Sequence, residues 1–232
     1  MNFLANPTFL LFLTLALYAL GIALSEKKKW IIFNPIILSM VVLMGYLYLL
    51  KIPYQNYEEA GKYIDFFLKP SIVALAVPLY VQWEKIKKQL FPILISQLIG
   101  CVVGVVSVVV LAKMTGAEQE IILSLAPKSV STPIALEISK SVNGIPSVTA
   151  AAVMIAGIFG SMVGFKVLNL TRISNPMSQG IAMGTSSHAM GTMKAMEVSN
   201  KYGAFASVGM IFNGIFTAVL APIILGLLSS YL

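Results

Sequence analysis

The stretch LFPILISQLIGCVVGVVSVVVLA, residues 90–112, determines the class of fold. It runs for 23 residues without a charged side chain. The hydrocarbon core of a bilayer is about 30 Å thick, and about 20 apolar residues of α-helix are needed to cross it. The run is therefore long enough and apolar enough to predict a transmembrane helix.

The composition of the whole chain agrees with that prediction. Of the 232 residues, 58% are hydrophobic and only 11% are charged, whereas soluble globular chains carry about 25% charged residues. The mean hydropathy is +0.87. The net charge of +7 does not indicate nucleic-acid binding, because the basic residues are scattered singly or in two short clusters between apolar runs. We therefore expect an all-α integral membrane protein.

Measured against the same length, eight segments are candidates for membrane helices: 7–24, 31–50, 66–83, 90–112, 120–139, 146–170, 176–197 and 203–231. The first lacks the basic region and the cleavage site of a signal peptide, so we expect it to be retained. The pattern predicts one polytopic domain, residues 1–232, with about seven or eight transmembrane segments. Segments 66–83 and 176–197 are both interrupted and both precede a long plain span, which suggests a possible internal repeat with halves 1–113 and 114–232.

Three of the eight segments contain residues that break helices. Segment 66–83 carries Pro78, segment 120–139 carries two prolines around a lysine, and segment 176–197 is rich in Gly, Ser and Thr. Backbone groups freed by such breaks need partners in protein or water. We therefore expect broken or re-entrant helices beside a central cavity, as in secondary transporters. If segment 120–139 or segment 176–197 re-enters the membrane instead of crossing it, the number of crossings changes, and so does the side on which the C-terminus lies.

The stretch APKSVSTP, residues 126–133, is the strongest candidate for a binding site. Lys128 stands between two prolines inside an apolar stretch, where an unpaired charge costs about 2.5–3.5 kcal/mol. An anionic substrate would supply the missing counter-charge, with hydroxyl groups adding hydrogen bonds. The candidate residues are Pro127, Lys128, Ser129, Ser131, Thr132 and Pro133. The alternative is that Lys128 extends to the membrane interface and the hydroxyls cap broken turns.

The stretch GTSSHAMGT, residues 184–192, is the second candidate. It contains the single histidine of the chain, whose side chain titrates near neutral pH and could bind a carboxylate or carry a coupled proton. The candidate residues are Thr185, Ser186, Ser187, His188, Gly191 and Thr192. A neutral histidine that only packs between helices is the alternative.

Weaker candidates lie in two other segments. Pro78 and Tyr80 could add a kink and a hydroxyl to the same cavity, or belong to a simple packing helix. Asn213 lies in the otherwise apolar last span, which favours an interhelical hydrogen bond first and a binding role second. Asn34 and Pro35 predict the start of a helix.

The sequence lacks the residues that several classes of chemistry require. A single cysteine, Cys101, and a single histidine cannot form a disulfide or a multi-histidine metal site within the chain. No paired carboxylates, nucleophile elbow or phosphate loop is present. We expect no enzyme activity, no metal and no cofactor. The acids near segment ends, Glu84, Glu137 and Glu197, are predicted to pair with Lys85, Lys88, Lys140 or Lys194.

Four motifs in order resemble the LrgB/CidB family, which includes the YohK-type bacterial inner-membrane proteins. They are LAVPLY (75–80), LAPKSVSTPIA (125–135), MGTSSHAMGTMKAMEVS (183–199) and GAFAS (203–207). The resemblance covers essentially the whole chain. It implies a multi-pass protein of the bacterial cytoplasmic (inner) membrane.

The resemblance implies two functions of different classes. One is holin/antiholin-like control of murein hydrolase export and cell lysis. The other is transport of small monocarboxylates, since the plastid glycolate/glycerate translocator contains a similar domain and bacterial relatives are linked to pyruvate uptake. The family also implies a small LrgA/CidA-like membrane partner, and we expect a homodimer or hetero-oligomer. A lesion-forming holin has no need of broken polar segments at membrane depth, so the residues favour carboxylate transport.

Overall fold

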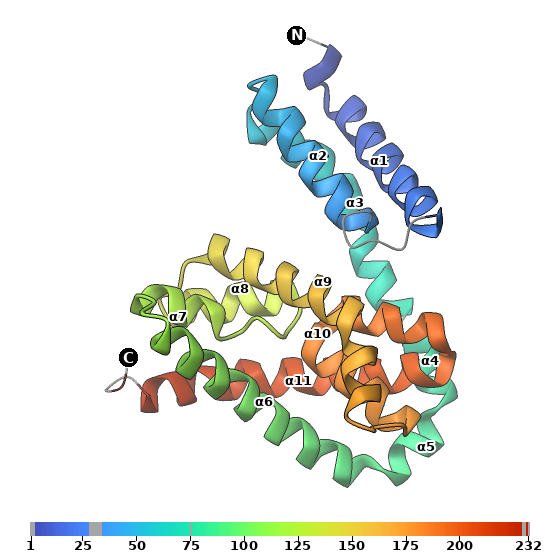
Figure 1. Cartoon of the computed structure of the whole chain (residues 1–232), viewed down its shortest axis with the longest axis vertical. Coiled ribbons are helices and arrows are strands. Elements are labelled where there is room, and N and C mark those ends of the chain that lie inside the picture. The colour runs from blue at the N-terminus through green and yellow to red at the C-terminus, as the bar shows by residue number, and fades with distance from the viewer. Residues whose placement is uncertain (1–2, 28–33, 75, 229–230, 232) are drawn as a thin grey trace. The chain divides into compact units, whose positions relative to one another are not determined.

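A computed structural model describes residues 3–27, 34–74, 76–228 and 231 of the chain. These residues form eleven α-helices and one short 3-10 helix, η1 (Phe3–Ala5), and the described residues contain no strand (Figure 1). Four helices are long and apolar enough to cross a membrane: α1 (Pro7–Lys27), α6 (Leu90–Met114), α9 (Pro146–Leu170) and α11 (Asn200–Leu227). The prediction of an all-α fold with several apolar spans is confirmed.

The chain divides into two compact units, residues 1–74 and 75–232. This division by contacts differs from the halves 1–113 and 114–232, which concern a repeat and stay a prediction.

The first unit consists of α1, α2 (Pro35–Leu49) and α3 (Tyr54–Ala74), with α1 packed against both other helices. Asn34 caps α2, because its Oδ1 accepts hydrogen bonds from the backbone N–H groups of Ile36 at 3.0 Å and Ile37 at 3.4 Å. Pro35 stands in the first turn, where its missing N–H leaves no helical bond unmade. The predicted helix start is therefore confirmed.

The predicted segment 66–83 is not one helix. Its first part belongs to α3, which starts at Tyr54 and contains Pro70, and α4 (Ala76–Val81) and α5 (Trp83–Lys88) follow. The helix-forming residues of Glu58–Lys62 join the apolar residues after them, so the polar connector and the start of the segment form a single helix.

The second unit contains α4 to α11. Within it, α6 packs against α11, and α9 packs against α10 (Pro176–Val198). The segment 120–139 forms two short helices, α7 (Gln119–Leu125) and α8 (Thr132–Ser141). Both segments that contain helix-breaking residues in this unit are thus placed between long apolar helices.

Helices α7 and α8 fold back on each other. Thr149 Oγ1 on α9 lies 2.9 Å from the carbonyl oxygen of Ser124 and 2.7 Å from Ser139 Oγ. In one straight helix Ser124 and Ser139 would be about 22 Å apart. Residues 119–141 therefore form a hairpin, called here the first hairpin, whose tip is the non-helical stretch 126–131.

Helix α10 folds back in the same way. It is broken at Ser187 and His188, and His188 has φ 42° and ψ −133°, a conformation in which a side chain other than hydrogen is strained. Met183 and Ala195 belong to one buried cluster, although a straight helix would separate them by about 18 Å. Residues 176–198 are therefore the second hairpin, with its tip at the break.

The two hairpins enter the second unit from opposite ends. The first end is marked by the buried cluster Ile86, Ile93, Ile181, Phe205 and Val208, from α5, the start of α6, the base of the second hairpin and the start of α11. The second end holds the cluster that includes Val109, Ala112, Ile122, Ile138 and Leu225, from the end of α6, the first hairpin and the end of α11. The tips of the hairpins consequently approach each other in the middle of the unit.

Candidate functional site

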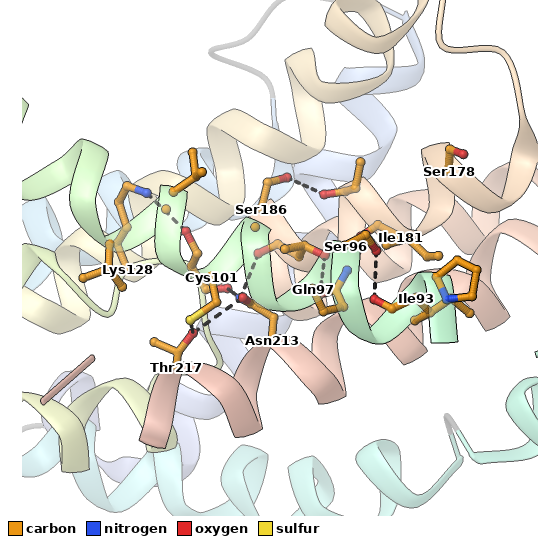
Figure 2. Close-up of a pocket in the computed structure, with 18 of the residues that line it drawn as sticks. Ile93, Ser96, Gln97, Cys101, Lys128, Ser178, Ile181, Ser186, Asn213 and Thr217 are labelled. Atoms are coloured by element: carbon orange, nitrogen blue, oxygen red, sulfur yellow. Dashed lines mark hydrogen bonds between the residues drawn. The ribbon is translucent and has the colours of Figure 1, made fainter. Parts of the chain in front are cut away.

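A cavity of about 590 Å³ lies where the hairpin tips approach each other (Figure 2). Its walls are α6, the first arm of the second hairpin, the tip of the first hairpin and α11. Five of the residues predicted from the sequence line it: Lys128, Ser129, Thr185, Ser186 and Asn213. Thus the cavity brings together residues from three segments that are far apart in the sequence.

Asn213 on α11 joins the two hairpins. Its Nδ2 donates to the carbonyl oxygen of Ser129 at 3.2 Å and to that of Thr185 at 3.0 Å, and the residue is only 2% exposed. Backbone carbonyls beside a break in a membrane helix need such partners. The predicted interhelical hydrogen bond is confirmed, and the same side chain also borders the cavity.

Lys128 brings a positive charge to the cavity. Its Nζ donates to Ser129 Oγ at 3.1 Å, and the residue is half-buried. Among the described residues the ion pairs join Lys87 with Glu84, Lys140 with Glu137 and Lys194 with Glu197, and none includes Lys128. The ammonium group is therefore left without a protein counter-charge in the described part of the chain.

The remaining candidates of the first tip lie outside the cavity lining. Pro127 is buried, Ser131 is half-buried, and Thr132 and Pro133 are exposed. Ser131 is the N-cap residue of α8 but makes no side-chain capping bond, so the first N–H groups of α8 are not capped by a side chain. Pro133 instead borders a separate hollow on the surface of α8.

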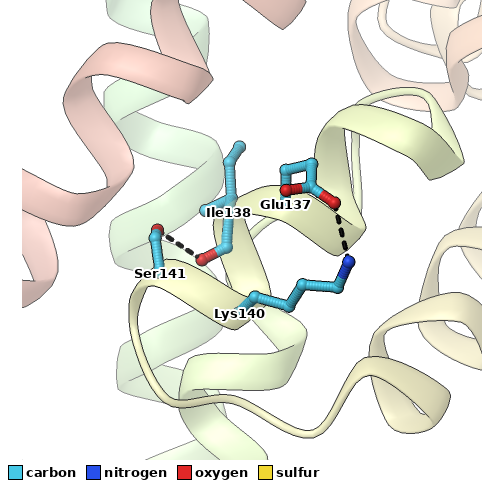
Figure 3. Close-up of polar contacts among 4 residues, drawn as sticks. All are labelled: Glu137, Ile138, Lys140 and Ser141. Carbon is cyan, nitrogen blue, oxygen red and sulfur yellow. Dashed lines mark hydrogen bonds and ion pairs between the residues drawn. The ribbon is translucent and has the colours of Figure 1, made fainter.

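The surface beside that hollow is held by local contacts (Figure 3). Lys140 Nζ lies 2.7 Å from Glu137 Oε1, and Ser141 Oγ donates to the carbonyl oxygen of Ile138 at 2.7 Å. The predicted pairing of Glu137 is confirmed, as is that of Glu197 with Lys194. Glu84 pairs with Lys87 instead of the predicted Lys85 or Lys88. Lys85 is one residue away and does not face Glu84 on the helix, whereas Lys87 and Lys88 both do, and the pair forms with Lys87.

The other candidates of the second hairpin do not line the cavity, and two of them, Ser187 and His188, face α9. His188 is buried, and its Nε2 lies 3.0 Å from the carbonyl oxygen of Val153. A Cβ atom on Gly157 would meet the imidazole ring at 2.6 Å, so the ring rests directly on the α9 backbone. The candidates outside the cavity lining are Ser187, His188, Gly191 and Thr192, and their role in binding or proton coupling stays a prediction.

The candidates from segment 66–83 are not brought to the cavity. Tyr80 is 80% exposed and is not among the lining residues. The side chain of Pro78 lies outside the described residues. A contribution from either residue stays a prediction.

Five polar residues of the cavity wall were not predicted from the sequence: Ser96, Gln97, Cys101, Ser178 and Thr217. Thr185 Oγ1 donates to Gln97 Oε1 at 2.8 Å, and Cys101 Sγ lies 3.3 Å from Thr217 Oγ1. The span 90–112 has no charged residue, so the sequence predicts a plain membrane helix there. The spacing of Ser96, Gly100 and Gly104 along one helix face was the available signal of a wall with small side chains.

The LrgB-like family model matches residues 14–227, which is most of the chain. The chain belongs to the LrgB-like family. The resemblance predicted from the four sequence motifs is therefore confirmed.

This LrgB-like chain is 34% identical to the uncharacterized protein YxaC of Bacillus subtilis, over 94% of this chain and 95% of that protein. It is 36% identical to an uncharacterized protein of Haemophilus influenzae, over 94% of each. It is also 33% identical to the antiholin-like protein LrgB of Bacillus subtilis, over 96% of this chain and 97% of the relative. No solved structure shows significant similarity to it.

Proposed function

We propose that this LrgB-like protein transports small monocarboxylates of the pyruvate, glycolate and glycerate class by alternating access. The observation that carries the proposal is the ammonium group of Lys128 at the cavity. Its one hydrogen bond in the described residues is to Ser129 Oγ, so it can donate further hydrogen bonds to an anion. A carboxylate supplies the counter-charge that a lysine at membrane depth requires.

The size of the cavity supports a small ligand. Its volume of about 590 Å³ lies within the range of about 300–1,000 Å³ that is common for small-molecule sites. Most of its lining surface is apolar, with polar side chains from the first tip, α6, α10 and α11 set among the apolar ones. An acid of two or three carbons would fit beside Lys128 with room for water.

The two hairpins support alternating access. Helix α8 and the second arm of α10 both begin at the tips, where the partial positive charge of a helix N-terminus attracts anions. The order of span then hairpin occurs twice, first as α6 with the first hairpin and then as α9 with the second hairpin from the opposite end. We infer an inverted repeat, with both hairpins re-entrant in the membrane.

This arrangement retains about seven or eight membrane segments if each hairpin counts as one. The fully crossing helices are then fewer, and they include α1, α6, α9 and α11. We propose the cytoplasmic (inner) membrane of a bacterium as the location.

The deciding experiment is uptake of radiolabelled pyruvate and glycolate into proteoliposomes. We expect saturable uptake by the wild type, none by Lys128→Ala, and partial uptake by Lys128→Arg, which keeps the charge. Lys140→Ala is the matched control, because Lys140 is paired at the surface of α8 and such pairs contribute little to stability. Equal uptake by Lys128→Ala and wild type would refute the assigned anion site.

A second candidate function is holin/antiholin-like regulation of murein hydrolase export and lysis. The observation that favours it is the name of the relative from Bacillus subtilis, antiholin-like protein LrgB. A pore would release solutes of similar size from the same proteoliposomes regardless of charge, and Lys128→Ala would not stop the release. That result would replace the transporter proposal.

The same uptake experiment also tests the oligomeric state. We propose that the protein works as a homodimer or with a small LrgA/CidA-like membrane subunit. Uptake that appears only when the small subunit is co-reconstituted would establish that the transporter needs both chains. Uptake by this protein alone would mean that the active form is a homodimer or a monomer. Size-exclusion chromatography with light scattering distinguishes these two forms.

A further inference from the structure

Helix α5 (Trp83–Lys88) is a short basic helix directly before the membrane span α6 (Figure 1). One residue anchors it to the second unit: Ile86 is 1% exposed and belongs to the buried cluster at the first end. The other residues of α5 are exposed. All of them except Trp83 are charged, so α5 presents a charged surface at the end of a membrane helix.

Two lysines of α5 are without a counter-charge in the described part of the chain. Lys85 and Lys88 lie three residues apart, so their side chains share one face of the helix. The ion pairs of the described residues include neither of them. The one acidic residue of α5, Glu84, pairs with Lys87 at 3.0 Å. With three lysines and one glutamate, α5 has a net charge of +2.

Within residues 76–228 no acidic residue is left to neutralise this face. The other acidic residue at the first end is Glu197, and its carboxylate pairs with Lys194. The remaining acidic residues of this range lie on the first hairpin or directly before it, and they are Glu118, Glu120 and Glu137. The first hairpin enters from the second end, so the counter-charge for α5 has to come from outside this unit.

The place of α5 in the chain indicates where that counter-charge lies. The span α6 begins at Leu90, two residues after Lys88. Aromatic side chains flank the lysines, with Trp83 43% exposed and Phe91 74% exposed. Tryptophan is enriched at the interface between membrane and water, and anionic lipids attract basic segments that adjoin membrane helices. Lys85 and Lys88 are thus expected at the depth of the lipid head groups.

We propose that α5 binds anionic phospholipids of the membrane surface, with the ammonium groups of Lys85 and Lys88 on the lipid phosphate. Ile86 shares its buried cluster with Ile93 and Ile181, which both line the cavity. Bound lipid therefore also steadies the end of the cavity nearest to α5. Lipid binding at α5 does not require that the protein transports carboxylates, so it is tested separately from transport.

The test uses Trp83 as a reporter of the lipids beside α5. The chain has two tryptophans, and Trp30→Phe leaves Trp83 alone. This protein is reconstituted in mixtures of phosphatidylglycerol, which is anionic, and phosphatidylcholine, which is zwitterionic. In each series only one of the two lipids is brominated near the head-group end of an acyl chain. Quenching of Trp83 fluorescence against composition gives the ratio of the two lipid binding constants.

We expect phosphatidylglycerol to be preferred by at least about fivefold with both lysines present. Lys85→Gln with Lys88→Gln should bring the ratio to about one, and Lys85→Arg with Lys88→Arg should keep the preference, because arginine retains the charge. Glu84→Gln with Lys87→Gln is the matched control. It changes two residues of the same helix but leaves its net charge at +2, so the ratio should stay as in the parent protein.

A second measurement needs no substitution. A lipid that binds the folded protein raises its thermal unfolding midpoint, so phosphatidylglycerol added to the wild type in detergent should raise the midpoint more than phosphatidylcholine does. A parent ratio near one, or equal midpoints with the two lipids, would overturn the proposal. So would a preference that survives in the double Gln variant at Lys85 and Lys88, or one that the control variant loses to the same extent.

Discussion

At the scale of single residues, the candidate site of the second unit is built around one charged side chain, Lys128, and its immediate neighbours. The Lys128 ammonium is held against Ser129, and Asn213 secures the backbone of Ser129 from α11. Other hydroxyls of the same motif point elsewhere, so membership of a Ser/Thr-rich stretch does not by itself place a residue at the cavity.

Ser129→Ala should weaken substrate binding, whereas Thr132→Ala should not. Ser129 Oγ positions the ammonium group, while Thr132 is exposed and lies outside the cavity lining. Loss of one such hydrogen bond corresponds to roughly a three- to tenfold higher half-saturation concentration for uptake. Uptake into proteoliposomes at a series of substrate concentrations measures the half-saturation concentration of each variant. Equal effects of the two substitutions would mean that the carboxylate is held elsewhere.

His188→Gln should alter the pH profile of uptake more than the affinity. Glutamine can still donate to the carbonyl oxygen of Val153, which His188 Nε2 contacts at 3.0 Å, but it cannot carry a proton near neutral pH. Uptake is measured with and without an imposed pH gradient. A pH profile identical to that of the wild type would remove His188 from proton coupling and leave it the role of packing α10 on α9.

At the scale of elements, close backbone contact between α10 and α11 holds the second hairpin in position. A Cβ atom on Gly209 would meet the carbonyl oxygen of Ile181 at 2.6 Å, and one on Gly184 would meet the backbone of Ala206. Small residues at such crossings allow membrane helices to approach closely. The first arm of the hairpin, which carries Thr185 and Ser186, therefore depends on glycine for its distance from α11.

Gly184→Ala should destabilise the protein by about 1–3 kcal/mol, the range for added volume in a packed interior. Gly226→Ala on α11 is the matched control, because nothing lies within 4 Å of the added Cβ atom there. Its effect should stay within about 1 kcal/mol. Thermal unfolding of both variants in detergent makes the comparison, and a similar midpoint for the two would contradict the close α10–α11 contact.

At the scale of the whole molecule, the folding back of both hairpins changes the distribution of positive charge. In the second unit, seven basic residues fall at the first end and two at the second. Those at the first end are Lys85, Lys87, Lys88, Lys166, Arg172, Lys194 and Lys201, and those at the second end are Lys113 and Lys140. Because cytoplasmic loops carry the excess of Lys and Arg, we expect the first end to be cytoplasmic and the C-terminus to be outside.

Cysteine accessibility tests this sidedness. In a Cys101→Ser background, Ser174→Cys should react with a membrane-impermeant thiol reagent from the cytoplasmic side only, and Thr115→Cys from the outside only. Both residues are exposed and lie beyond the ends of α9 and α6, respectively. Eight simple crossings would put both cysteines on the same side, so labelling of both from one side would refute the re-entrant first hairpin, which lies between the two positions.

The interrupted segments show most clearly what the sequence predicts and what it leaves open. Pro127, Pro133 and the Gly/Ser-rich stretch around residue 187 correctly predicted where helices break, since these residues weaken helices wherever they occur. A break does not determine the direction in which the chain continues. The return of α8 to Ser124 and of α10 to Met183 depends on contacts with α9 and α11, which are far away in the sequence.

By itself the sequence determined the membrane class, the helical content, the breaks, the unusual lysine and the family, because each depends on local composition or on a contiguous motif. Only the tertiary structure decided that Lys128 shares a cavity with Gln97, and that Asn213 joins the two hairpin tips. The polar residues of α6 look unremarkable in an apolar run. Their importance arises from which helix packs opposite them, and that is a property of long-range packing.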